Sequence, residues 1–181
     1  MIILDIDQDF FFTYEGESKT QTGEPEDFIE QITIQDVLKK YDSENAPFKI
    51  FSQHDEVYYE IHRMKIKDIH LIHLDRHDDL ERDEYNSKCI NLGNWISYLI
   101  NDEIVKIVDW VSFQDLNISQ DKKFNEKKYT LNSQNYFNHQ PLNIDYIFFT
   151  LSPEFVPHHN NFLKFIEIKS KVKQLNGQIF I

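Results

Sequence analysis

The chain has 181 residues, of which 40% are hydrophobic, and its formal net charge at pH 7 is −12. This length fits a single domain, residues 1–181, with one hydrophobic core. A surface this acidic repels nucleic-acid phosphates and anionic lipid, which argues against a nucleic-acid or membrane partner. It would attract a cationic substrate or peptide, although the same charge can serve solubility alone.

Glycine and cysteine are both scarce. The chain has four glycines and contains neither GxGxxG nor GxxxxGK(S/T), so nucleotide-phosphate loops are not expected. The single cysteine, Cys89, cannot form an intramolecular disulfide, and no apolar run approaches the length of a membrane span. We therefore expect a cytoplasmic protein.

Apolar, β-rich runs alternate with helix-like segments along the chain. In chain order we predict the strand Ile2–Ile6, a helix capped by Thr33 that runs to Tyr41, the strand Phe48–Ser52, the helix Glu56–Ile66, the strand Ile69–Leu74, the helix Leu92–Ile100, the strands Ile104–Val108 and Ile144–Thr150, the helix Asn161–Leu175 and the strand Gln178–Ile181. Short apolar strands of this kind are typical of buried parallel sheets. The prediction is a three-layer α/β fold, with a mostly parallel sheet flanked by helices.

Two polar segments interrupt this pattern. Thr13–Asp27 contains two glycines and a proline, and it is predicted to be a loop. Gln114–Pro141 is rich in Asn, Lys and Gln, and we interpret it as an excursion, a lid or a substrate-binding insert.

The strongest chemical signal follows the strand Ile69–Leu74, which leads directly into Asp75-Arg76-His77-Asp78-Asp79. Alternate residues of an extended segment share a face, so Asp75, His77 and Asp79 can converge on an ion. Carboxylates combined with imidazole suit Mn, Zn or Fe. The alternative is a polar strand end whose aspartates cap a helix.

A second signal follows the first strand, where Asp5, Asp7 and Asp9 alternate. Packed carboxylates raise one another's pKa unless a cation lies among them. The alternative is a solvated acidic strand end. A third candidate is His54, at the junction between a predicted strand and a predicted helix, where a lone histidine is often only structural. All three clusters follow predicted strands, and open parallel sheets bind ligands at that edge.

These residues resemble the arginase/ureohydrolase superfamily, in which a strand-end histidine precedes an Asp-x-His-x-Asp motif and Ser-x-Asp-x-Asp ends another strand. Here Asp5-Ile6-Asp7-Gln8-Asp9 is similar to the latter motif, but it opens the chain instead of following the other motifs. This permuted order, with Gly93-Asn94-Trp95 and Ser152-Pro153-Glu154-Phe155, is similar to a small arginase-like family. That family includes peptide arginases, which convert arginine residues of ribosomal precursor peptides to ornithine.

The resemblance implies two Mn²⁺ ions held by six side chains. One ion would be bound by His54, Asp75, Asp79 and Asp7, and the other by Asp75, His77, Asp7 and Asp9. Asp75 and Asp7 would bridge the ions. In an alternative register, Asp5 and Asp7 are the ligands; we prefer Asp7 and Asp9 because they lie nearer the end of the strand.

The function that the resemblance implies is hydrolysis of the guanidinium of peptide arginine to ornithine and urea. Two ions about 3.5–4 Å apart lower the pKa of a shared water, which would attack the guanidinium carbon as hydroxide. Asp9 and His77 are the candidate catalytic residues for proton transfer. Glu154 and Asn94 are the candidate substrate-binding residues. Glu154 follows the strand Ile144–Thr150 at the same strand-end layer as the metal motifs, although Thr150 stands at the offset of the family's guanidinium-binding glutamate. Asn94 follows the central motif at about the distance where arginases bind the main chain of the substrate.

Two other functions stay open at this point. The first is hydrolysis of a small guanidino or amide compound, such as free arginine, agmatine or an acetylated amine. The second is a non-catalytic, metal-dependent peptide-binding module.

Overall fold

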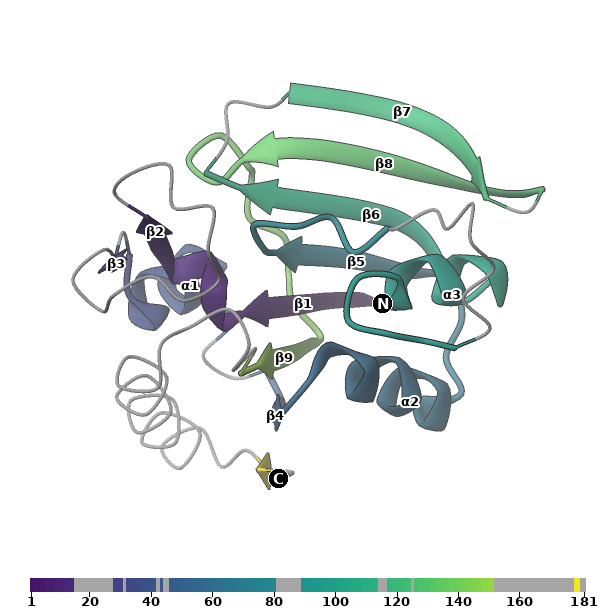
Figure 1. Ribbon diagram of the computed structural model, residues 1–181, viewed down its shortest axis with the longest axis horizontal. Coiled ribbons are helices and arrows are strands. Elements are labelled where there is room, and N and C mark those ends of the chain that lie inside the picture. Colours follow the sequence, from purple (N-terminus) through teal and green to yellow (C-terminus); the bar gives the residue numbers. More distant parts are fainter. Residues whose placement is uncertain are drawn as a thin grey trace.

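The computed structural model describes residues 1–14, 28–30, 32–41, 43, 46–80, 89–113, 117–124, 126–151 and 178–179. Within these ranges eight strands form one sheet (Figure 1). In spatial order they are β10 (Gln178–Ile179), β4 (Phe48–Phe51), β9 (Tyr146–Thr150), β1 (Ile2–Asp7), β5 (Ile69–Leu74), β6 (Val105–Ser112), β8 (Lys127–Asn135) and β7 (Asn117–Phe124). Neighbouring strands are parallel except β7 and β8, so the predicted mostly parallel sheet is confirmed.

Helices cover both faces of the sheet. Successive side chains of a strand point to opposite faces, and in β1 Leu4 and Ile6 pack with α1 (Ile34–Lys40) in one buried cluster. Ile3 belongs to a second buried cluster, which contains residues of α2 (His54–Met64) and α3 (Trp95–Asn101). The three-layer arrangement is therefore confirmed. Burying both faces accounts for the apolar runs in the central strands β1, β5 and β9.

Helices α1 and α2 each begin where local hydrogen bonds fix the first turn. Thr33 caps α1 through a reciprocal pair with Asp36: the Thr33 hydroxyl accepts the Asp36 N–H at 3.2 Å, and the Asp36 carboxylate accepts the Thr33 N–H at 2.9 Å. The Glu56 carboxylate similarly accepts the N–H of Ser52 at 2.8 Å. Helix α2 consequently begins at His54, two residues before the predicted start.

The polar segment 114–141, for which no strand was predicted, contains regular structure. It contains β7 and β8, an antiparallel pair that extends the sheet at its β6 edge. In β8 the buried residues Tyr129, Leu131 and Ser133 alternate with less buried ones, a period of two that the high polar content conceals. Lysines on an edge strand such as β7 discourage pairing with another chain.

The N-terminal polar segment is described only at its edges. After β1 a 3-10 turn, η1 (Gln8–Phe11), leads into β2 (Phe12–Tyr14), which pairs with β3 (Phe28–Glu30). The rest of the predicted loop Thr13–Asp27, the predicted helix Asn161–Leu175 and Glu154 lie outside the described residues. In the part of the chain that is described, no helix has the length and apolar character needed to cross a membrane.

Candidate metal centre

The acidic and histidine motifs meet where β1 and β5 end. These strands are parallel neighbours (Figure 1), and their register places Asp5 beside His73 and Ile6 beside Leu74. Asp5 and Asp7 lie on the sheet face that α2 and α3 cover, as does Ile3, because alternate residues share a face. Asp5, Asp7 and Asp9 are all almost completely buried, so the alternative of a solvated acidic strand end does not apply.

Among the three aspartates, Asp9 is distinguished by its hydrogen bonding. The Asp7 carboxylate accepts the backbone N–H of Asp9 at 2.9 Å, which holds the η1 turn in place. As a carboxylate, Asp9 itself finds no hydrogen-bond donor for either oxygen among the described residues. Burial, followed by the charges of Asp7 and Asp75, raises the pKa of Asp9 well above its usual range. A buried acid in this state is stabilised by a cation.

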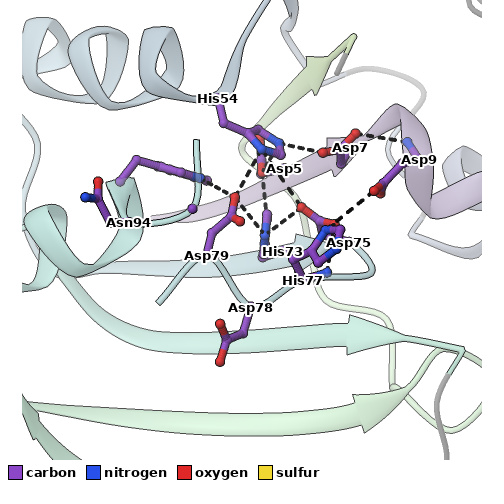
Figure 2. A network of polar contacts seen from close by, with 12 residues as sticks. Asp5, Asp7, Asp9, His54, His73, Asp75, His77, Asp78, Asp79 and Asn94 are labelled. Carbon is purple, nitrogen blue, oxygen red and sulfur yellow. Dashed lines mark hydrogen bonds and ion pairs between the residues drawn. The ribbon is translucent and has the colours of Figure 1, made fainter. Parts of the chain in front are cut away.

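The segment 75–79, which follows β5, curls around the end of β1 (Figure 2). Asp75 accepts the N–H of His77 at 2.9 Å, and the left-handed backbone at Asp79, with φ 48°, turns the chain back toward the strand end. Burial alone would raise the pKa of Asp75, but the neighbouring imidazoles of His73, His77 and His54 outweigh it and hold this pKa well below its usual range. Asp79 accepts the indole N–H of Trp95 at 2.6 Å, which fixes its carboxylate.

His54 completes the cage from the first turn of α2. Its Nδ1 lies 3.0 Å from an Asp79 oxygen and its Nε2 lies 3.4 Å from an Asp7 oxygen (Figure 2). The ring stacks on Trp95 with centroids 5.6 Å apart. Burial opposes charging of this imidazole, but the carboxylates of Asp7 and Asp79 prevail and raise the pKa of His54 to about 10. His54 is therefore part of the site and not a capping residue alone.

The structure brings all six predicted ligands into one cage. Three groups of residues each have ligand atoms that lie within 4.8 Å of one another. The groups are Asp7, His54 and Asp75; Asp9, Asp75 and His77; and His73, Asp75 and Asp79. Buried oxygens or ring nitrogens without a hydrogen-bond partner in the described structure occur at Asp5, Asp9, His54, His73 and Asp75. Orphaned ligand atoms that converge in this way fit a metal ion. The buried clusters can hold a metal, whereas ligation by each of the six side chains stays a prediction.

The register of the first motif follows from the same groups. Asp7 and Asp9 belong to them, whereas Asp5 does not. Asp5 instead lies 2.8 Å from Nδ1 of His73 and 3.8 Å from Nε2 of His54. Asp7 and Asp9 are thus the two aspartates of this motif whose oxygens converge with other ligand-type atoms, and their role as the ligand pair stays a prediction.

His73 is the residue that sequence reasoning left without a role. It is fully buried, with Nδ1 on Asp5 and Nε2 at 3.2 Å from an Asp75 oxygen. It was given no ligand role because it lies within the predicted strand Ile69–Leu74, before the segment 75–79 to which the ligands were assigned. The available signal was its position two residues before Asp75, which places both side chains on one face of the strand.

A cleft of about 680 Å³ opens onto the cage. Beside the ligand residues Asp7, His54, Asp75, His77 and Asp79, its walls are formed by Arg76, Asp78, Asn91, Leu92, Gly93 and Trp110. The Trp110 indole N–H donates to the backbone carbonyl of Asp75 at 3.1 Å, which fixes the ring beside the strand end. His77 has 54% of its side chain exposed, so solvent and ligand reach the cage from its side.

Asn94 occupies a different place from the one expected of a substrate contact. It is 2% exposed; its side-chain oxygen accepts the N–H of Asn91 at 2.8 Å, and its amide donates to the carbonyl of Cys89 at 3.3 Å. The cleft wall reaches Asn91 and Gly93 instead. Asn94 therefore shapes the loop before α3, and a direct role in substrate binding stays a prediction.

Comparisons of the chain with protein-family models, with curated proteins and with solved structures give no match. What the chain does must therefore be inferred from the chemistry of this centre.

Proposed function

We propose that the chain is a hydrolase that holds two Mn²⁺ ions and converts arginine residues of a peptide to ornithine and urea. The observation that carries the proposal is the cage of buried carboxylates in which Asp9 has no donor for either oxygen. Four carboxylates of the predicted ligand set carry the charge that two divalent ions neutralise: Asp7, Asp9, Asp75 and Asp79. The resemblance of these motifs to the small arginase-like family supports manganese and arginine as the metal and the substrate.

The position of Asp75 supports two ions over one. Its Oδ2 lies 3.9 Å from Nδ1 of His54, and its Oδ1 lies 3.5 Å from Nδ1 of His77. The two oxygens of one carboxylate thus face two different histidines. A carboxylate placed in this way is suited to bridge two cations.

His77 stands on the open side of the cage, and the buried Asp9 lies beside it. Nδ1 of His77 lies 3.5 Å from an Asp9 oxygen, and the His77 ring is the exposed member of the site. When bound, a pair of divalent ions supplies Lewis acidity and a water of lowered pKa. The residues that can hold or transfer a proton next to the departing amine are Asp9 and His77.

The cleft supports a cationic substrate. Asp78 lines it outside the predicted ligand set and points away from the cage (Figure 2). One Asp78 oxygen accepts the N–H of Leu80 at 3.1 Å, which holds the carboxylate in place. A carboxylate binds a guanidinium through paired hydrogen bonds, and the face of an indole such as Trp110 attracts a cation. The cleft volume lies within the range of ligand pockets and exceeds what one side chain fills.

The test uses purified protein, freed of metal and reloaded with Mn²⁺, and an arginine-containing peptide from a gene near its own. Mass spectrometry should show loss of CH₂N₂ from the peptide, with release of urea. The Asp121→Asn variant, changed on β7 far along the sheet, is the control and should retain activity. If urea were released only from free arginine or agmatine, the substrate would be a small molecule and not a peptide. Metal-dependent peptide binding without turnover would reduce the protein to a binding module.

A further inference from the structure

His73 is a buried side chain for which the proposed chemistry has no use. It lies near the end of β5, fully buried between Asp5 of β1 and the curled segment that carries Asp75 and Asp79 (Figure 2). Its ring contacts Trp95 edge-on, with centroids 5.7 Å apart and planes at 79°. The ring is thus held by packing and cannot turn freely.

Asp5 determines which ring nitrogen carries the proton. Nδ1 of His73 lies 2.8 Å from an Asp5 oxygen, a contact that the parallel register of β1 and β5 sets directly. An ionised carboxylate only accepts hydrogen bonds, so Nδ1 must be the donor. In the neutral imidazole the lone pair then resides on Nε2.

Nε2 is aimed at the carboxylate cage. It lies 3.2 Å from an Asp75 oxygen and 3.6 Å from an Asp79 oxygen, and it has no hydrogen-bond partner in the described part of the chain. A position so close to two carboxylate oxygens suits Nε2 either to carry a proton or to share a cation with them. These atoms form one of the three clusters that can hold an ion, and a cation between them would be bound by the lone pair of Nε2 and by both carboxylates.

A second buried histidine shows what a purely structural one looks like in this chain. His139 lies on the opposite face of the sheet, where Nδ1 is 3.0 Å from the Tyr41 hydroxyl and Nε2 is 3.1 Å from an Asp109 oxygen. Both of its ring nitrogens therefore have partners. His73 has one partner and one nitrogen directed at metal-binding carboxylates.

We infer that His73 binds a metal ion through Nε2 as a third histidine ligand, beside Asp75 and Asp79, and that Asp5 orients it. Histidine ligands of metals usually donate their other N–H to a carboxylate, which is the arrangement of Asp5 and His73. The inference rests on the proposed function in that it requires a metal in the cage. It assigns Asp5 the role of a positioning residue.

The experiment counts histidine ligands without measuring activity. The full chain, with isotope-labelled histidine, is loaded with an NMR-active cadmium isotope, and couplings between cadmium and ring nitrogens are recorded. We expect three coupled histidines: His54, His73 through Nε2, and His77. The His73→Gln variant should lose one coupling and assign it, whereas His139→Gln, the matched buried control, should retain all three.

The outcomes separate this inference from the proposed function. Coupling to His54 and His77 only, or to His73 through Nδ1, would overturn the role of His73 and leave the metal centre intact. Absence of any coupling would refute both the proposed metal centre and the role of His73 in it. If His73→Gln does not fold, the count in the unmodified chain still decides. Asp5→Asn should retain the His73 coupling but weaken cadmium affinity about 10–100-fold, the usual effect of losing an orienting partner.

Discussion

Replacing Asp9 by asparagine should stabilise the metal-free protein and remove its response to metal. The carboxylate of Asp9 is 1% exposed, lacks a donor for both oxygens in the described structure and lies among the charges of Asp7 and Asp75. An asparagine has the same shape, carries no charge and offers N–H donors to these neighbours. Relief of a buried unsatisfied group contributes about 1–3 kcal/mol to the free energy of unfolding.

The sign should reverse when metal is present. In the unmodified chain, Mn²⁺ at 100 times its dissociation constant adds about 2.7 kcal/mol to the free energy of unfolding. The Asp9→Asn variant loses a ligand and should gain little of this. Because a change of 1 kcal/mol shifts the melting temperature of a chain of this size by about 2–4 °C, the variant should melt roughly 2–12 °C higher without metal.

Thermal unfolding after treatment with a chelator, and again during Mn²⁺ titration, measures both effects. The matched control is Asp109→Asn, because Asp109 is also buried but accepts hydrogen bonds from His70, His139 and Asn132. This control should destabilise the protein with and without metal. If Asp9→Asn destabilised the metal-free protein as the control does, or responded to Mn²⁺ as the unmodified chain does, the reasoning about Asp9 would be refuted.

Three further predictions concern the cage and the cleft. Asp75→Ala should lose both metal equivalents and all activity, because Asp75 belongs to all three ligand groups; elemental analysis that found two equivalents retained would contradict the bridging role. Metal-free protein should lose stability as the pH rises from about 6.5 to about 10. The pKa of His54 is raised on folding, so its charge stabilises the folded protein below this pH range and is lost as the pH rises through it. Chemical denaturation across this range should show a smaller loss of stability for metal-free His54→Asn than for the metal-free unmodified chain. Asp78→Asn should raise KM for the arginine peptide about tenfold with kcat little changed, an effect of about 1.4 kcal/mol on a charge-assisted contact that steady-state kinetics would measure.

The sequence predicted the strands that carry the site closely. Ile69–Leu74 was predicted with the bounds that β5 has, because charged residues flank its apolar run on both sides. The Thr33 cap was also confirmed, since a capping box needs only residues three apart. The hairpin of β7 and β8 was missed because its polar composition hides a period of two.

Local pattern by itself determined that aspartates and histidines alternate as the chain leaves two buried strands, which suffices to predict a metal site and its ligand types. Only the tertiary structure decided that β1 and β5 are parallel neighbours in a register that places Asp5 on His73 across 68 residues of chain. It also moved Asn94 into the loop before α3 and put Asp78 and Trp110 in the cleft wall. Such contacts depend on which strands pair and how loops fold back over them, and strand pairing between distant segments is set by packing of the whole core.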